Sequence, residues 1–555
     1  MTATGPSASR GALLVSGKVI TMDPAMPRAE AFGVRAGRIV SVGSRNDVRD
    51  TLGRGVEEYR AERGAIVPGL IDSHNHMLWT GIQRMQADIA GCGSIAELLQ
   101  ALRRYARTHP DREWIVCGPG WHVERLAEKR YPTRQELDSV SSSRPIYLPR
   151  VGHAAAVNTA ALRRAGVGRD TADPPGGRIS RDAQGEPDGL LLEPPAFNLV
   201  GRLVPPMSRE ERRQALREVQ RAYHAAGICG VIDPGLAPED MAVYEDLQRA
   251  GELTVRSVVM PLAQTHDEPD RVIDSLRAWG VRTGFGNERL KLGGVKVFLD
   301  GGASLGTALM REPWPDEKCQ CGIQVTHTDL FHRVVETCAS SGWSLGVHTV
   351  GGKAIDIALS VFEEVDRRYP IRDLRFSLIH AYLWPTEANI AVARRLNVGV
   401  ATQASMQYQF APLLVRRFGR DLVGKATPVK SWIDGDIVVG GGSDSPVTPY
   451  PPLLGMWHAV TRHVDALGES LGADEAVSPQ QALAMYTRGS AWLSFSEHER
   501  GMIRPGMLAD WVSLSEDPLE CDPMGIREIR VDATAVGGEL VHRAWGGAPA
   551  GRRAG

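Results

Sequence analysis

Residues 66–76 read IVPGLIDSHNH, an almost unbroken apolar run that ends in polar residues. Such a run is typical of a parallel β-strand that is covered on both faces. Similar runs recur through the middle of the chain, and helical patterns separate several of them. The predicted strands are 66–72, 228–233, 255–260, 294–300, 343–348, 375–380, 397–402 and 437–444. Alternating strands and helices in this number predict an α/β fold, a closed (β/α)8 TIM barrel.

Two further regions interrupt and flank this predicted barrel. Much more chain separates the first two strands than any later pair, so we expect an inserted subdomain at 111–205, after barrel strand 1. Both chain ends instead contain short β-like runs that glycine punctuates, as it does in tight hairpins. We expect residues 1–65 and 496–555 to pair into one small β-sandwich domain, with the barrel over 66–495.

The composition is that of a soluble globular protein. The 555 residues are 43% hydrophobic and 23% charged, and the formal net charge of -2 indicates no nucleic-acid partner. No apolar run is long enough for a membrane span, and no secretion signal opens the chain. Seven scattered cysteines argue against a disulfide framework. We therefore expect a cytoplasmic protein that acts on a small molecule, with a homodimer as an allowed assembly.

Histidines and one aspartate stand at the ends of the predicted strands. His74 and His76 follow the first strand, His348 and His380 end the fifth and sixth, and Asp444 ends the eighth. Active sites of barrels form at the C-terminal ends of the strands, so these side chains should meet at one rim. Alternate residues of an extended segment face the same side, which lets the first two histidines share one ion. Imidazole and carboxylate ligands suit zinc or a similar divalent metal.

Lys296 lies inside the apolar strand GVKVFLD, residues 294–300. Burial of an unpaired ammonium costs several kcal/mol, so this side chain should be neutralised, modified or paired. A lysine carboxylated by CO₂ would supply two metal-binding oxygens. The alternative is an ion pair with Asp300, which has the same strand parity.

Taken together, these segments resemble the amidohydrolase superfamily, and within it the amidohydrolase family 3 (YtcJ-like) group that includes N-substituted formamide deformylases. The resemblance runs nearly from end to end. Its motifs are KVITMDPAMPRAEAFGVRAGRIVSVG, IVPGLIDSHNH, VKVFLDGGASLGTA, GVHTVGGKAID, RFSLIHA, GGSDSPV, ALAMYTRGSAWLS and GMIRPGMLADWVSLSEDPL.

The resemblance implies a metal centre of one or two divalent ions such as Zn²⁺. Lys296 would be the carboxylated lysine that bridges them. The implied ligands are His74, His76, Lys296, His348, His380 and Asp444. In the insertion, the resemblance also places His153 and Asn158 near the substrate, and Glu193 ends the family motif GLLLE.

The chain departs from the family pattern in two places. The family has H-x-x-G-D-x-A where this chain reads His348-Thr-Val-Gly-Gly352-Lys353-Ala, so an acidic side chain outside the ligand set is missing. The later segment Gln403-Ala-Ser-Met-Gln-Tyr408 is close to the family's Q-P-x-F but lacks the proline.

We predict hydrolysis of a non-peptide C–N bond of amide type, such as an N-acyl or N-formyl bond. The metal would activate water and polarise the carbonyl, while Asp444 would take the proton from water and pass it to the leaving nitrogen. His153 or His122 would be a further donor. An apolar or aromatic substrate group is expected. The residues predicted to contact the substrate are Trp121, His122, Asn158, Glu193, Trp314, Gln403 and Tyr408.

Two other functions remain open at this point. A deaminase of aminated heterocycles shares the barrel, metal and water, but commonly places a Glu three residues after a strand-end histidine, where this chain has Gly351 and Leu383. A non-catalytic binding protein that kept the fold typically loses ligands, and six candidates are present here.

Overall fold

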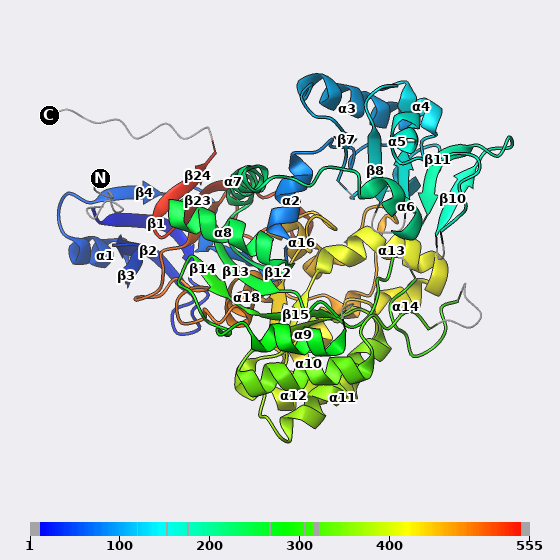
Figure 1. Cartoon of the computed structure of the whole chain (residues 1–555). Coiled ribbons are helices and arrows are strands. Elements are labelled where there is room, and N and C mark those ends of the chain that lie inside the picture. Colours follow the sequence, from blue (N-terminus) through cyan, green and yellow to red (C-terminus); the bar gives the residue numbers. More distant parts are fainter. Residues whose placement is uncertain are drawn as a thin grey trace. The chain divides into compact units, whose positions relative to one another are not determined.

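The computed structural model describes residues 11–118, 120–121, 123–150, 154–174, 177–192, 194–265, 268–304, 306–315 and 321–544. The chain forms two compact units, whose elements are labelled in Figure 1. The large unit consists of Met1–His76 and Gln220–Gly555, and the small unit of Met77–Val219. Within the described part of the chain, no helix is long and apolar enough to cross a membrane.

Parallel strands form the centre of the large unit. One sheet has the order β14 (Leu290–Leu292), β13 (Arg256–Pro261), β12 (Ile228–Leu236), β6 (Leu70–Asp72). The other has the order β15 (Gly294–Phe298), β16 (Ser344–Thr349), β17 (Ser377–His380), β18 (Gly399–Thr402), β19 (Val439–Gly441). Each predicted strand region contains one of these strands, and β14 is an addition. The predicted α/β class is confirmed.

The two parallel sheets meet at both of their edges. Lys296 of β15 forms a parallel bridge with Leu262, which follows β13. At the other edge, the backbone N–H of Ser73 donates to the carbonyl of Gly441 at 2.9 Å, which joins the end of β6 to β19. Strands that are separated by most of the sequence therefore end next to each other.

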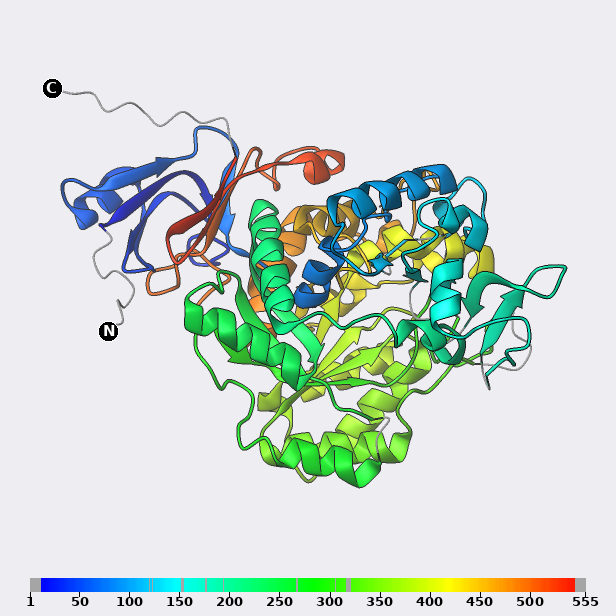
Figure 2. The ribbon, with the colours of Figure 1, turned by 45° about the horizontal axis from the view of Figure 1, so that its top comes forward.

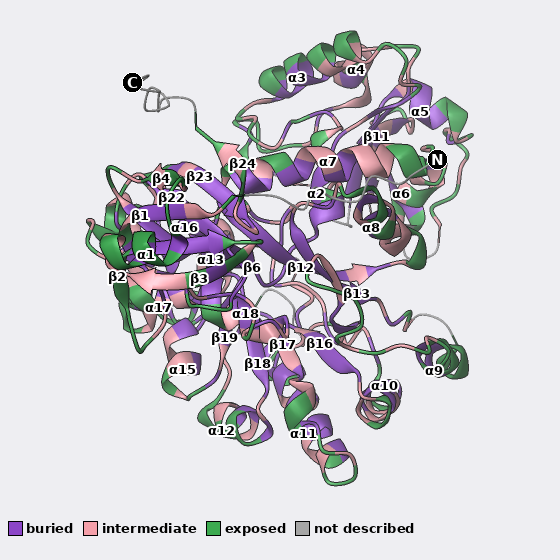
Figure 3. Ribbon diagram, turned by 90° about the vertical axis from the view of Figure 1, so that its left-hand side faces the viewer, coloured by how far each residue is buried: buried purple, intermediate pink, exposed green. Residues whose placement is uncertain are grey.

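Helices follow most of these strands and cover them. Figure 3 shows the strands buried at the centre of this unit and the helices exposing their outer faces. The helices are α8 (Pro238–Ala250), α9 (Pro269–Arg277), α10 (Thr328–Ser341), α11 (Gly352–Asp366), α12 (Glu387–Leu396), α13 (Ala404–Phe418), α14 (Arg420–Gly424), α15 (Val429–Asp434), α16 (Pro452–Thr461), α17 (Pro479–Ala484) and α18 (Ser490–Leu493). Short elements between them are η2 (Arg372–Leu374), β20 (His463–Val464), β21 (Glu469–Ser470), η3 (Ala473–Glu475) and η4 (Met485–Gly489).

The two ends of the chain share one mixed sheet, as predicted. Figure 2 shows its first strands in blue beside its last strands in red. The order is β24 (Glu539–Arg543), β23 (Val531–Val536), β22 (Trp511–Leu514), β5 (Ala65–Pro68), β1 (Leu13–Ile20), β2 (Arg28–Arg35), β3 (Arg38–Gly43), and β4 (Glu57–Arg60) also pairs with β1. Helix α1 (Arg45–Leu52) follows β3, and η5 (Pro523–Glu528) lies between β22 and β23 in the sequence. Its core includes Phe32 and Trp511, whose rings meet edge to face with centroids 6.3 Å apart.

A buried ion pair links this mixed sheet to the parallel strands. Arg256 of β13 donates two hydrogen bonds to Asp510, at 2.7 and 3.0 Å, and the side chains are 1% and 3% exposed. The backbone N–H of Gly537 donates to the same carboxylate at 2.8 Å. Burial alone would raise the pKa of Asp510, but the guanidinium of Arg256 holds it below its ordinary value.

Replacing Asp510 by alanine should lower the free energy of unfolding by about 3–5 kcal/mol, because it leaves the guanidinium of Arg256 buried without its carboxylate. Urea denaturation at pH 7 measures this change. Asp50→Ala, on the exposed face of α1, is the control and should change stability by less than about 0.5 kcal/mol. Because the folded pKa of Asp510 is depressed, its contribution is present above about pH 4 and is lost as the pH falls further. Equal stability of the two variants would contradict the assignment.

The small unit has its own sheet and core. The strand order is β10 (Arg178–Arg181), β11 (Pro187–Leu192), β9 (Ala154–Val157), β8 (Ile146–Arg150), β7 (Ile115–Val116). Its helices are α2 (Met77–Arg84), α3 (Ile95–Thr108), η1 (Val123–Arg125), α4 (Arg134–Asp138), α5 (Thr159–Arg164) and α6 (Pro194–Gly201), and α7 (Arg209–Ala225) runs on into the large unit. The predicted insertion, 111–205, lies within this unit, and its exact bounds stay a prediction.

Candidate metal centre

His74, His76 and Asp444 form a compact cluster of possible metal ligands. Each offers one ligand atom, and these atoms all lie within 4.8 Å of one another. The Nε2 atoms of the two histidines are 3.1 and 3.2 Å from the same carboxylate oxygen of Asp444. All three side chains are buried. Two segments that are far apart in the sequence, but that follow the neighbouring strands β6 and β19, thus bring two imidazoles and a carboxylate to one point.

His348 and His380 extend this cluster. The Nε2 of His380 lies 3.0 Å from the Nδ1 of His348, and the rings of His74 and His380 are 5.1 Å apart. On its other side, the Nδ1 of His380 is 2.6 Å from the amide oxygen of Gln403, whose own amide nitrogen donates to the carbonyl of Ala401. Because the amide oxygen can only accept, His380 donates from Nδ1 and keeps a lone pair on Nε2. That lone pair faces the other histidines.

Lys296 of β15 reaches the same region. Its side chain is fully buried, and its ammonium nitrogen has no hydrogen-bond partner among the residues that the structure describes. The nitrogen lies 4.7 Å from the centre of the Phe298 ring. Burial lowers the pKa of Lys296 to about 7, against the opposing effect of the carboxylates of Asp444 and Asp300. Near pH 7, a substantial fraction of the protein molecules therefore carries Lys296 as the neutral amine.

In the described part of the chain, Asp300 binds backbone N–H groups and forms no ion pair with Lys296. Its carboxylate accepts the backbone N–H groups of Leu309, Val350 and Gly351 at 2.9, 2.9 and 2.8 Å. Burial raises the pKa of Asp300 to about 7, although these hydrogen bonds oppose the shift. Asp300 thereby fastens the segment after β15 to the end of β16, which carries His348.

The protonation of the cluster suits a divalent cation. Burial lowers the pKa of His74 to about 4 and that of His348 to about 3, and it lowers the pKa of His380 well below its ordinary value. Burial would raise the pKa of Asp444, but its hydrogen bonds with His74 and His76 hold it well below its ordinary value. Neutral imidazoles beside an ionised carboxylate are the form in which these groups bind metals.

The backbone at two of these positions is strained. His380 and Asp444 have φ angles of +75° and +56°, in the left-handed region that non-glycine residues rarely adopt. Such strain persists only where the surroundings enforce it, and it is concentrated at functional sites. His380 ends β17 and Asp444 lies three residues after β19, so the strained backbone turns both side chains toward the cluster.

Sequence reasoning missed Asp72, which connects the segment that carries His74 to the segment that carries Asp444. Its buried carboxylate accepts the hydroxyl of Ser443 at 2.6 Å, the backbone N–H of Ser443 at 3.0 Å and the side-chain amide of Asn75 at 2.9 Å. Burial raises the pKa of Asp72 to about 6, although these hydrogen bonds oppose the shift. Since Ser443 directly precedes Asp444, this network fixes the carboxylate relative to His74. The only signal in the sequence was that Asp72 ends an apolar run.

Asp233 of β12 is a second residue that the sequence did not reveal. One carboxylate oxygen accepts the hydroxyl of Tyr244, and the other lies 3.8 Å from the Nδ1 of His76. The 3.8 Å separation is that of an ion pair and not of a hydrogen bond, so the carboxylate acts on the His76 ring through its charge. Asp233 ends the apolar run ICGVID in the sequence, but β12 continues beyond it to Leu236.

Replacing Asp233 by asparagine should lower metal affinity by about 10- to 100-fold, the usual cost of losing such a partner of a ligand. Competition with a chelator of known affinity measures this. Asp240→Asn, on α8, is the matched control and should bind metal like the wild type. Unchanged affinity in both variants would show that His76 does not depend on Asp233.

The predicted substrate contacts are distributed over both units. Gln403 contacts His380, as described above. In the small unit, Trp121 is buried and its indole N–H donates to Pro149, while Asn158 caps α5. In the large unit, the indole N–H of Trp314 donates to Ala308, and the hydroxyl of Tyr408 donates to Asp465 at 3.1 Å. His122, His153 and Glu193 lie outside the described residues, so the substrate roles of all seven positions and of His153 stay predictions.

Comparisons with known proteins agree with this picture. "Putative amidohydrolase YtcJ" of Bacillus subtilis is 31% identical over 536 residues, which cover 95% of this chain and 98% of that protein. The N-substituted formamide deformylase of Arthrobacter pascens is 29% identical and covers 96% of this chain and 98% of its own. A crystal structure of an uncharacterized metal-dependent hydrolase from Pyrococcus horikoshii has the same fold, with a TM-score of 0.75, 24% identity and coverage of 92% of this chain and 99% of that one. Residues 61–542 match the amidohydrolase family, and the chain therefore belongs to that family.

Proposed function

We propose that this chain is a metal-dependent amidohydrolase that hydrolyses a non-peptide C–N bond of amide type in a small molecule. The observation that supports this most directly is the meeting of His74, His76 and Asp444, with ligand atoms within 4.8 Å of one another. His348 and His380 lie beside them. We also propose a closed (β/α)8 barrel, because the two parallel sheets are joined at both edges. For the mixed terminal sheet we propose a β-sandwich arrangement.

The residues present fit a divalent metal, for which we propose Zn²⁺ as one or two ions. The donor set is imidazole and carboxylate, as zinc prefers, and the buried nitrogen of Lys296 has no hydrogen-bond partner in the described part of the chain. We propose that a carboxylated Lys296 completes the set of His74, His76, His348, His380 and Asp444. When bound, a divalent ion supplies Lewis acidity, which polarises a carbonyl and makes water nucleophilic at neutral pH.

Asp444 is the residue that moves the proton in this proposal. Its pKa lies well below the ordinary value, so it is ionised and can accept a proton from the attacking water. It then returns this proton to the leaving nitrogen as the C–N bond breaks. The positive φ at Asp444 and the network of Asp72 and Ser443 fix the carboxylate in place, which saves reorganisation during the reaction.

The substrate we propose is an N-acyl or N-formyl amine. The name of the Arthrobacter relative specifies N-substituted formamides, and that relative matches nearly the whole chain. The missing acidic side chain at Gly352 separates this chain from the usual family pattern. The guanidinium of Arg311 covers that glycine, because a Cβ there would lie 2.5 Å from its Nη1. This guanidinium also donates two hydrogen bonds to Asp356 at 2.8 Å, so an ion pair occupies the start of α11. We expect the amide preference to differ accordingly.

A screen of N-formyl, N-acyl and cyclic amides, with and without a chelator, tests reaction class and substrate together. The expected result is amine release from at least one linear amide, loss of that activity on chelation and its return with added Zn²⁺. Aminated heterocycles are assayed in parallel for ammonia release. Ammonia without amide hydrolysis would instead support a deaminase. A purified chain that neither contains nor responds to a divalent metal would contradict the proposal.

A further inference from the structure

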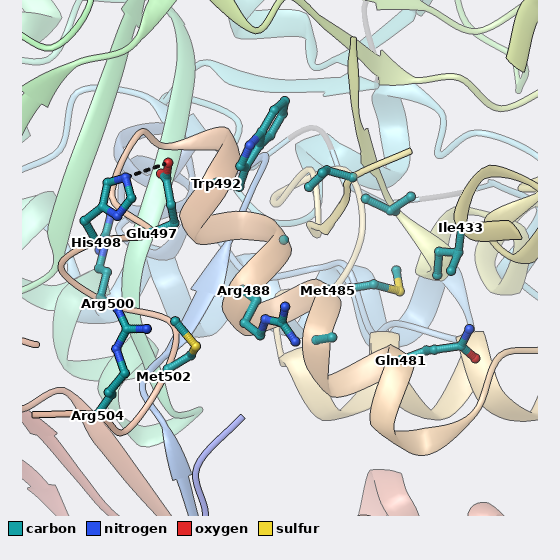
Figure 4. Close-up of a pocket in the computed structure, with 14 residues that line it drawn as sticks. Ile433, Gln481, Met485, Arg488, Trp492, Glu497, His498, Arg500, Met502 and Arg504 are labelled. Carbon is teal, nitrogen blue, oxygen red and sulfur yellow. Dashed lines mark ion pairs between the residues drawn. The ribbon is translucent and has the colours of Figure 1, made fainter. Parts of the chain in front are cut away.

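A cavity lies in the large unit, at the other end of β19 from Asp444. It has a volume of about 520 Å³ and is lined by residues between Ile433 and Arg504, including Val439, the first residue of β19 (Figure 4). Asp444 follows the last residue of the same strand by three positions. Cavities of about 300–1,000 Å³ are the usual size of small-molecule sites. We call this space the η4 cavity, after the helical segment Met485–Gly489 that forms part of its wall.

The wall of the η4 cavity is mainly apolar. Ile433, Val439, Met485, Trp492 and Met502 supply aliphatic, thioether and indole surface. In Figure 4, Met485 and Trp492 project from the same helical run, and Ile433 faces them from the other side. Removal of an apolar group from water into such a space is favourable. The body of a ligand that fits here is therefore an aromatic or alkyl group.

The charges around the η4 cavity are predominantly positive. Arg488 and Arg504 are exposed, and the described residues give neither of them an ion pair. The carboxylate in the lining, Glu497, is already engaged, because Arg375 donates to it at 2.6 and 3.0 Å. Two guanidinium groups at the rim thus lack an acidic partner in the part of the chain that is described. An anionic group on the ligand would supply one.

Arg500 also borders the cavity, but the end of its guanidinium points inward. The residue is only 6% exposed, and a Cβ at Gly230 of β12 would lie 2.2 Å from its Nη1. The positive charge that a ligand in the cavity can reach is therefore that of Arg488 and Arg504, and a carboxylate would balance it.

The backbone of η4 itself is unusual. Met485–Gly489 is a π-helix, a form that is rare and appears frequently at functional sites. Met485 and Arg488 of this turn line the cavity, while Tyr486 packs on β19, where a Cβ at Gly441 would lie 2.6 Å from its ring. The widened turn thus presents Arg488 to the cavity and still keeps its tyrosine against the strand that leads to Asp444.

We propose that the η4 cavity is a second ligand site, distinct from the metal centre, that binds a small carboxylate with an aromatic or alkyl body. The apolar wall takes the body, and the carboxylate pairs with Arg488 and Arg504. This assignment does not depend on the reaction proposed for the metal centre.

Isothermal titration of the full chain with 4-phenylbutyrate tests the site, with 4-phenyl-1-butanol as the uncharged probe of the same shape. We expect the carboxylate to bind and the alcohol to bind at least about ten-fold more weakly. Arg488→Gln/Arg504→Gln should weaken 4-phenylbutyrate by at least about ten-fold and leave the alcohol unaffected. Arg54→Gln, an exposed arginine of the mixed-sheet region, is the matched control and should bind like the wild type.

A second variant tests the cavity by shape. Ala484→Phe places a ring in the lining without changing its charge, and it should abolish binding of both probes while the arginine variants retain the alcohol. A thermal melt of each variant verifies folding, and the arginine pair decides the question if Ala484→Phe does not fold. Carboxylate binding that persists unchanged in Arg488→Gln/Arg504→Gln would overturn the proposal and place the ligand elsewhere, such as at the metal centre. Absence of binding at millimolar 4-phenylbutyrate would also overturn it.

Discussion

Asp444→Asn should lower kcat by at least about 100-fold while the protein keeps its metal, because loss of a general base typically costs between about 10² and 10⁴ in rate. Asparagine has the size of aspartate and keeps one oxygen that can remain near the Nε2 atoms of His74 and His76, now 3.1 and 3.2 Å from the carboxylate. It cannot accept the proton from water at neutral pH. Steady-state kinetics and metal analysis on the same preparation measure both quantities.

The control for this prediction is Asp474→Asn, an exposed aspartate of η3, which should have wild-type kcat and metal content. Near wild-type turnover of Asp444→Asn would contradict the role of Asp444 in proton transfer. Loss of metal together with activity would make Asp444 chiefly a ligand. The two results are distinguishable because adding Zn²⁺ in excess restores activity only in the second case.

The parallel strands were predictable because their burial on both faces leaves nearly continuous apolar runs in the sequence. The run at 66–72 shows where this reasoning stops. In the structure it divides into β5 of the mixed sheet and β6 of the parallel strands, and the break falls at Gly69. A Cβ at Gly69 would lie 2.7 Å from the sulfur of Cys229, so the chain crosses between the sheets where no side chain fits. Hydrophobicity alone does not reveal such a contact with a distant residue.

The candidate ligands were predictable for a similar reason, since all but Lys296, which lies inside β15, stand at or shortly after strand ends that share one rim. Their supporting residues were not. Asp72 ends β6 and Asp233 lies within β12, but a single aspartate has no characteristic spacing, and the partners Ser443 and Tyr244 become neighbours only in the fold. The sequence predicted Gln403 as a substrate contact, and the direction of its side chain, onto His380, required the structure.

Lys296→Ala should remove most activity and lower metal content, and it gives the sharpest test of a carboxylated lysine. The nitrogen of Lys296 is fully buried without a hydrogen-bond partner among the described residues, a position that costs several kcal/mol for an ammonium. Burial lowers its pKa to about 7, so the neutral amine is available near neutral pH. That neutral amine can attack CO₂, forming an N–C bond and releasing one proton, which leaves a carbamate anion suited to metal.

Three measurements follow for Lys296. Metal-free wild-type protein reconstituted with Zn²⁺ should regain activity faster with added bicarbonate, and faster as the pH rises through about 7, because only the neutral amine reacts. Labelling with ¹³C-bicarbonate should give a carbamate resonance in the wild type and none in Lys296→Ala. Lys353→Ala, an exposed lysine on α11, is the matched control and should behave like the wild type. Lys296 is not carboxylated if Lys296→Ala keeps wild-type metal content and turnover, or if added bicarbonate does not change the rate of reconstitution. The site would then hold its metal through His74, His76 and Asp444 with the two neighbouring histidines alone.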